Sequence, residues 1–268
     1  MKTAGQNVRP AAVAGSFYPA QPAQLGRMVE TFLEEAKSGW TPDPKAVIAP
    51  HAGYIYSGPI AGSAFRAWAE HPKSIRRIIL LGPSHYVAFP GIALPRAAGF
   101  LTPFGPVPVD ARAIAQLRSL PRICEFDPAH EREHCLEVEL PFLQQTVSDF
   151  AIVPLVIGEA TDDEVRDAVE LLWGGDETRF VLSSDLSHYH DYDTARWMDR
   201  ATAAAIEGAR PEQLSANQAC GCLAIRGFLK AAARRGLNAR ALDLRNSGDT
   251  AGPRDSVVGY GAFAFAGN

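Results

Sequence analysis

Three histidines of this 268-residue chain share one sequence context, each lying just after a short apolar segment. The segments read AVIAPHAGY, IILLGPSHY and FVLSSDLSHY, and their histidines are His51, His85 and His188. In open α/β sheets, ligands bind beyond the carboxyl ends of the strands. If the three segments are neighbouring strands, their imidazoles converge on one crevice. A single histidine in this position is usually a hydrogen-bonded loop residue, but three in the same context favour a convergent site.

Such a site would suit a metal ion. Neutral imidazole is the commonest metal ligand in proteins, and two histidines with one anionic ligand suit a divalent ion. The third ligand should be a thiolate or a carboxylate, and Cys220 is the thiol candidate beside two of these histidines. A following helix N-terminus and a bound cation would both favour the thiolate form of Cys220. The alternative is a buried, inert thiol. Cys222 either packs in that helix, which we favour, or forms an oxidisable pair with Cys220.

Two further polar clusters supply candidate side chains. In the segment EREHCLEVE, His134 and Glu137 are three residues apart, so we expect them on one helix face, lining the pocket. The alternative is a solvated first turn, where acids are favoured by the helix dipole. Asp185 precedes His188 by three residues and either orients an imidazole or caps the next segment. We expect His188 and Asp185 to be the catalytic pair, with His188 moving a proton.

Helical and strand-like segments alternate along the chain. Apolar residues at helical spacing predict helices over residues 21–37, 62–70, 111–120, 135–147 (bent near Pro141), 161–173, 194–207 and 222–235. Short apolar runs predict strands over residues 45–49, 77–81, 151–157, 180–183, 241–245 and 257–265. This alternation predicts a three-layer α/β fold with a mostly parallel or mixed central sheet flanked by helices. The Pro- and Gly-rich region 89–109 is expected to hold antiparallel strands or a loop over the site.

Composition excludes several classes of protein. A net charge of −4 and a pI near 6.0 provide no basic surface for nucleic acid. The longest apolar runs are strand-sized, so we expect no membrane span, and the first residues contain no signal-peptide pattern. The four cysteines match neither a disulfide framework nor a zinc finger, which indicates a cytoplasmic protein. No repeat or linker divides residues 1–268, so we expect a single domain.

Longer motifs resemble those of the Memo family. They are AGSFYP, PHAGY, GPSH, EHCLEVELPFL, SSDLSHY, ACG and SVVGYGAFAF, in order from Ala14 to the last predicted strand. The resemblance implies a fold similar to class III extradiol dioxygenases, which are non-haem iron enzymes that cleave catechol rings. It also implies metal binding by His51, His85 and Cys220, with Cys220 standing where the dioxygenases have a glutamate. His188 matches the acid–base histidine of the dioxygenases.

The exchange of a carboxylate for a thiolate softens the metal site, so ring cleavage does not follow from the resemblance. We expect Fe(II), with copper or zinc as alternatives. The resemblance further implies redox chemistry, a small-molecule or phosphorylated-peptide ligand, and a radical S-adenosylmethionine protein as a partner. Three functions stay open, in this order: an iron-dependent enzyme acting on oxygen or a related oxidant, a non-enzymatic module that binds a peptide or protein, and a zinc-dependent hydrolase.

Overall fold

The computed structural model describes residues 7–36, 42–69 and 75–267, and every structural statement below concerns these residues. The strands are β1 (Val8–Arg9), β2 (Ala46–Ala49), β3 (Arg77–Pro83), β4 (Ile92–Leu94), β5 (Gly99–Thr102), β6 (Gly105–Pro108), β7 (Ile123–Glu125), β8 (Ala151–Ile157), β9 (Thr178–Ser183), β10 (His188–His190), β11 (Asn238–Asn246) and β12 (Val257–Ala266). The helices are α1 (Pro22–Glu35), α2 (Tyr54–Ala69), α3 (Ala111–Leu117), α4 (Pro128–Glu131), α5 (Leu140–Thr146), α6 (Asp162–Leu171), α7 (Tyr192–Glu207) and α8 (Cys222–Ala233), with 3-10 turns η1 (Pro211–Gln213) and η2 (Ser247–Asp249).

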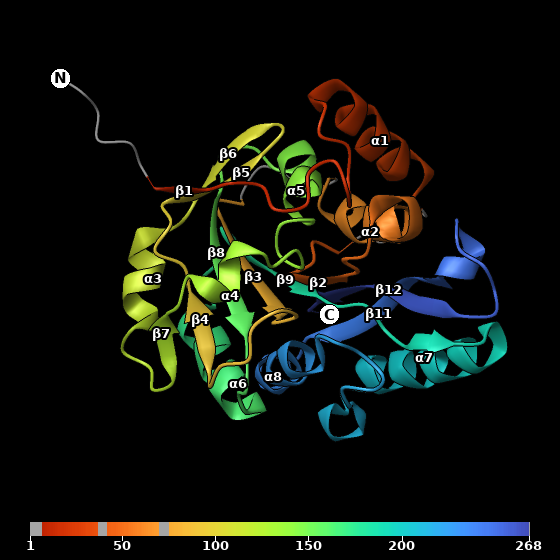
Figure 1. Cartoon of the computed structure of the whole chain (residues 1–268). Helices are drawn as coiled ribbons and strands as arrows, with labels where there is room; N and C mark the ends of the chain where they lie inside the picture. Colours follow the sequence, from red (N-terminus) through yellow and green to blue (C-terminus); the bar gives the residue numbers. More distant parts are fainter. Residues whose placement is uncertain (1–6, 37–41, 70–74, 268) are drawn as a thin grey trace.

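A nine-stranded sheet forms the middle of the molecule (Figure 1). Its strand order is β10-β12-β2-β9-β3-β8-β4-β7, and β11 pairs with β12. Strands β2, β9, β3 and β8 are mutually parallel, whereas β12 and β4 run antiparallel to β2 and β8. The sheet is therefore mixed, with helices on both faces, and the predicted three-layer α/β class is confirmed.

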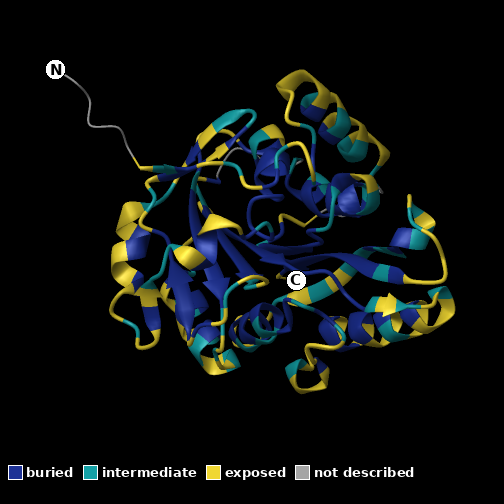
Figure 2. Ribbon diagram, viewed as in Figure 1, coloured by how far each residue is buried: buried dark blue, intermediate teal, exposed yellow. Residues whose placement is uncertain are grey.

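Both faces of the sheet are buried. In β3, Ile78 and Leu80 belong to the core beneath α1, α2 and α5, whereas Ile79 and Leu81 belong to the core beneath α6 and α8. Successive strand residues point to opposite faces, so a strand covered on both sides needs a continuous apolar run. Figure 2 shows this as a buried sheet between helices whose outer faces are exposed. No helix in the described part of the chain is long and apolar enough to cross a membrane.

Two helices, α2 and α5, begin well away from their predicted starts. Helix α2 begins at Tyr54, well before the predicted start at residue 62, and it contains Pro59. Its small and aromatic residues are buried almost all round, so they lack the one-sided pattern that marks a surface helix. The last residues predicted for two helices, Lys37 and Glu70, lie outside the described residues.

The helix predicted over residues 135–147 is confined to α5. Pro141 lies in the first turn of α5, where a missing N–H costs no hydrogen bond, so it starts the helix instead of bending it. The preceding residues form turns, and the Glu133 carboxylate accepts hydrogen bonds from the next two backbone amides. His134 and Glu137 therefore do not share a helix face, as the next subsection describes.

The Pro- and Gly-rich region forms strands, the first of the two expected alternatives. Strand β4 joins the central sheet antiparallel to β8, and β5 and β6 form an antiparallel pair. Strand β1 adds to β5 and completes a small second sheet. Residues 89–109 do not line the pocket of about 490 Å³ described next, although Phe89 lines the second cavity, which Cys220 also lines.

Candidate metal centre

The strands that precede the three histidines are neighbours in the sheet, in the order β2-β9-β3. His51 follows β2 and His85 follows β3, and their ring centroids lie 5.1 Å apart. His188 lies further from its strand, in the short β10 that pairs with β12. Parallel neighbouring strands thus bring residues distant in sequence to one edge of the sheet.

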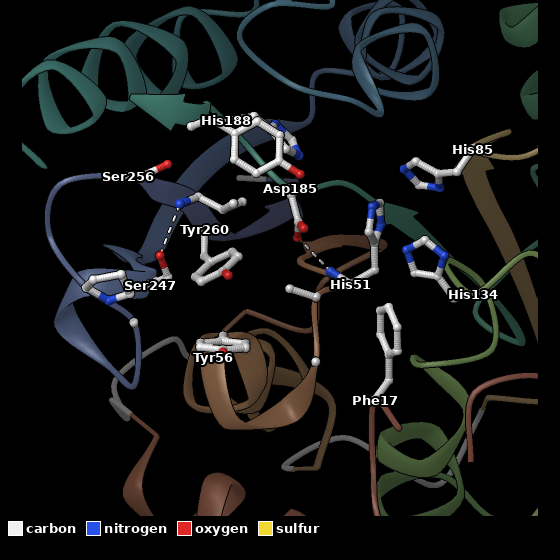
Figure 3. A pocket seen from close by; sticks show the side chains of 16 residues that line it. Phe17, His51, Tyr56, His85, His134, Asp185, His188, Ser247, Ser256 and Tyr260 are labelled. Atoms are coloured by element: carbon white, nitrogen blue, oxygen red, sulfur yellow. Dashed lines mark hydrogen bonds between the residues drawn. The ribbon is translucent and has the colours of Figure 1, made fainter. Parts of the chain in front are cut away.

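A third imidazole completes this cluster. His134, from the turns before α5, lies with its ring centroid 5.5 Å from that of His51 and 4.6 Å from that of His85. The potential ligand atoms of the three rings all lie within 4.8 Å of one another. Figure 3 shows the three rings side by side at one end of a pocket of about 490 Å³, which His188 and Asp185 also line.

His51 is buried and held through one ring nitrogen. Its Nδ1 lies 2.7 Å from Oγ of Ser183, and its Nε2 lies 3.3 Å from Sγ of Cys220. The Ser183 hydroxyl can donate to the carbonyl of Cys135 at 2.6 Å, so we assign the His51 proton to Nδ1, which donates to Ser183. Burial, aided by the neighbouring histidines, lowers the pKa of His51 well below its ordinary value. The ring is therefore neutral, and its Nε2 lone pair faces Cys220.

His85 is held by Glu133. One carboxylate oxygen lies 2.8 Å from Nδ1 of His85, and the other accepts the backbone N–H of His85 at 2.7 Å. Burial alone would raise the pKa of Glu133, but the hydrogen bonds from His85 and backbone amides together lower it. Glu133 is thus a carboxylate that accepts from Nδ1 and leaves Nε2 free. Metal-binding histidines are typically oriented in this way.

Sequence reasoning gave Glu133 no role. Glu133 adjoins His134 in the sequence, but 48 positions separate it from His85, and a pattern of residue types carries no sign of that pairing. We expect Glu133→Gln to weaken metal binding about 10- to 100-fold, because His85 loses a charged acceptor that fixes its ring. Competition with a chromophoric chelator measures this change, and the exposed neighbour Glu131→Gln is the matched control. Equal affinities for the two variants would contradict the orienting role.

Cys220 contacts His51, but it is not one of the three residues whose potential ligand atoms all lie within 4.8 Å of one another. An ion bonded to sulfur at about 2.3 Å and to nitrogen at about 2.0 Å in tetrahedral geometry separates the two ligand atoms by about 3.5 Å. The observed 3.3 Å between Sγ of Cys220 and Nε2 of His51 fits that arrangement. The sulfur also accepts the backbone N–H of Asp185 at 3.3 Å. Cys220 itself lines a second cavity, of about 540 Å³.

The thiolate expected for Cys220 is not favoured by the protein alone. Burial, aided by the nearby Asp185, raises the pKa of Cys220 to about 12. Helix α8 begins only at Cys222, so its N-terminus does not outweigh burial. A bound cation is therefore needed to deprotonate this sulfur. Cys222 is buried in the first turn of α8, in agreement with the favoured expectation that it packs in this helix.

Asp185 and His188 both line the pocket, but they are not paired. The carboxylate of Asp185 accepts the backbone N–H of His51 at 2.8 Å (dashed in Figure 3), so it fixes the turn that carries His51 instead of orienting the ring of His188. Burial raises the pKa of Asp185 to about 7. Burial also lowers the pKa of the half-buried His188. Two groups able to hold or release a proton therefore face the same space as the imidazoles.

Glu137 lies away from the pocket, which corrects its expected place there. Its carboxylate is fully buried, lies 2.6 Å from the guanidinium of Arg9 and accepts the Tyr18 hydroxyl at 2.7 Å. Two backbone amides of the same N-terminal segment also donate to it. Glu137 thus anchors the segment that places Phe17 against the ring of His134, with centroids 4.7 Å apart.

Comparisons with known proteins identify the family of this chain. A family model described as Memo-like protein matches residues 9–264. The chain belongs to the Memo family. A MEMO1 family protein of Ignicoccus hospitalis is 34% identical over 284 residues, which cover 96% of this chain and 98% of the relative. MEMO1 family proteins of Nitrosopumilus maritimus and Aquifex aeolicus are 31% and 33% identical, each over 96% of this chain and 99% of the relative.

The family resemblance predicted from the sequence motifs is therefore confirmed. In this Memo protein, the motif PHAGY contributes His51, GPSH contributes His85 and ACG contributes Cys220. The segment EHCLEVELPFL contributes His134 at its start and turns Glu137 away from the pocket. Three of these motifs thus contribute the histidines of one cluster that could hold a metal ion, and ACG contributes Cys220, which contacts His51 of that cluster.

Proposed function

We propose that this Memo protein binds one metal ion through His51, His85 and Cys220 and carries out redox chemistry there. The observation that carries the proposal is the 3.3 Å contact between Nε2 of His51 and Sγ of Cys220, beside a second histidine held through Nδ1. Two neutral imidazoles and one thiolate would leave open positions on the ion. Fe(II) is the metal that we propose, with copper or zinc as the alternatives that a thiolate favours.

The donor set fits such an ion. The two imidazoles have Nδ1 occupied by Ser183 and Glu133, so each offers Nε2 without any change of tautomer. Iron bound there would supply one-electron redox chemistry and positions for an oxidant. The chain would supply proton transfer, because His188 and Asp185 line the same pocket as the imidazoles.

His134 is the competing third ligand, and a pair of variants separates it from Cys220. We expect Cys220→Ser to remove the thiolate charge-transfer band of the Co(II)-loaded protein and to weaken metal binding more than tenfold, because the only soft anionic ligand is lost. We expect His134→Ala to keep that band. Absorption spectroscopy measures both. A band retained in Cys220→Ser would show that sulfur is not a ligand.

The reaction class is tested on anaerobically purified protein reconstituted with Fe(II). Oxygen uptake in the presence of a reductant, lost in His51→Ala, supports redox chemistry at this site. Stoichiometric zinc after native purification, with no oxygen uptake by the iron form, would favour a hydrolase instead. No metal bound by the wild type under any of these conditions would refute the proposal.

A non-enzymatic binding module is the second candidate, and the rim of the pocket favours it. Tyr189 is 78% exposed there, and Phe17 and Tyr56 also line the pocket. An exposed tyrosine beside half-buried aromatic side chains around a cavity suits a peptide or protein partner. The partner classes that we propose are a peptide and a radical S-adenosylmethionine protein. Binding lost in His85→Ala and Tyr189→Ala, without turnover in the wild type, would place binding above catalysis.

A further inference from the structure

A fully buried carboxyl group lies behind the metal centre. Glu139 has no exposed surface, and none of the ion pairs among the described residues involves it. One carboxyl oxygen lies 2.8 Å from Oγ of Ser183, and the other has no hydrogen-bond partner in the described structure. A buried carboxylate without a cation is strongly disfavoured, and burial raises the pKa of Glu139 well above its ordinary value. Glu139 therefore carries a proton in the metal-free protein.

The hydrogen bonds around Ser183 fit a protonated Glu139. The Ser183 oxygen lies 2.6 Å from the carbonyl of Cys135, 2.7 Å from Nδ1 of His51 and 2.8 Å from Oε1 of Glu139. A hydroxyl donates once and accepts twice. The carbonyl can only accept, so Ser183 donates to it and accepts the protons of Glu139 and His51. Each polar hydrogen then has an acceptor, and Glu139 is separated from His51 by one hydroxyl.

Among residues 7–36, 42–69 and 75–267, no cationic side chain pairs with Glu139. The titratable groups that interact with it are Tyr54 of α2, the thiol of Cys135 in the turns before α5, and Asp185 after β9. The tyrosine and the thiol are neutral or negative, and the aspartate adds to the negative potential. A cation at Nε2 of His51 would be the positive charge that this buried group lacks.

We propose that Glu139 is a positioning residue that acts on the metal centre through Ser183, holding a proton in the metal-free protein and releasing it when a cation binds to His51. The proposal rests on the proposed metal binding and adds how that binding depends on pH. A cation on Nε2 makes Nδ1–H a stronger donor to Ser183. The Glu139 O–H bond breaks, its proton passes to solvent, and the Ser183 hydroxyl turns from the Cys135 carbonyl to the new carboxylate. No electron is transferred in this step.

Zn(II) binding to the full chain tests the proposal, because zinc is redox-silent. Calorimetric titration in buffers of different ionisation enthalpy gives the number of protons released per ion. We expect the wild type to release about one proton more than Glu139→Gln, whose amide keeps the shape and the donor of the neutral acid. The logarithm of the wild-type dissociation constant for zinc should also change more steeply with pH than that of Glu139→Gln, by about one additional tenfold step per pH unit.

Ser183→Ala is the second variant and keeps the test valid if Glu139→Gln does not fold. We expect this variant also not to release the extra proton, because the Glu139 carboxylate would have no hydrogen-bond donor. Equal proton counts for the wild type and Glu139→Gln would overturn the proposal while leaving metal binding intact. Release of the extra proton by Ser183→Ala would overturn the role of the Ser183 hydroxyl. Failure of the wild type to bind zinc would overturn both this proposal and the proposed function.

Discussion

His51→Ala is expected to lower metal affinity by more than about 100-fold, a larger effect than loss of any residue that orients a ligand. The ring of His51 contacts Cys220 through Nε2 and Ser183 through Nδ1. Its removal deletes one proposed ligand and also the imidazole that links the sulfur of Cys220 to the hydroxyl of Ser183. Chelator competition and metal analysis of the purified variant measure the change.

His190→Ala is the matched control for that variant. His190 lies in the same short strand as His188 but does not line the pocket, so its loss should leave metal affinity unchanged. Circular dichroism of both variants checks that the fold is kept. Stoichiometric metal with wild-type affinity in His51→Ala would remove the basis of the proposed site.

Glu137→Ala is expected to cost about 3–5 kcal/mol of unfolding free energy, the largest stability effect that we predict. The substitution leaves the guanidinium of Arg9 buried without its carboxylate and frees the Tyr18 hydroxyl and two backbone amides. Removal of one partner from a buried ion pair is costly because the other charge has no solvent to replace it. Urea denaturation monitored by tryptophan fluorescence measures the loss.

Glu125→Ala provides the control for that measurement. Glu125 pairs with Arg96 and Arg118 at the surface, where both arginines are more than half exposed. Exposed pairs contribute only about 0–1 kcal/mol. A similar small cost for Glu137→Ala would mean that the N-terminal segment is not anchored by this carboxylate.

The sequence predicted the parts of the fold that depend on local patterns. Continuous apolar runs identified the strands buried on both faces, such as β8, whose predicted and observed bounds agree. The strand–histidine context placed His51 and His85 at one edge of the sheet, because neighbouring parallel strands present their carboxyl ends together. These inferences need only the period of a strand and the direction of its chain.

The residues that hold the site were less predictable, because their roles depend on contacts between distant segments. Glu133, Ser183 and Glu139 act through hydrogen bonds across 44 to 132 positions of sequence, which no local period encodes. His134 and Glu137 were expected on one helix face, but they lie in turns, where spacing does not fix the direction of a side chain. Glu137 accordingly points to Arg9 and His134 to the pocket.

Anomalous diffraction from crystals of the metal-loaded wild type locates the ion and its ligands. We expect one peak about 2.0–2.4 Å from Nε2 of His51, Nε2 of His85 and Sγ of Cys220. A peak bonded to His51, His85 and His134 with the sulfur turned away, or a peak elsewhere in the molecule, would refute the proposed metal centre.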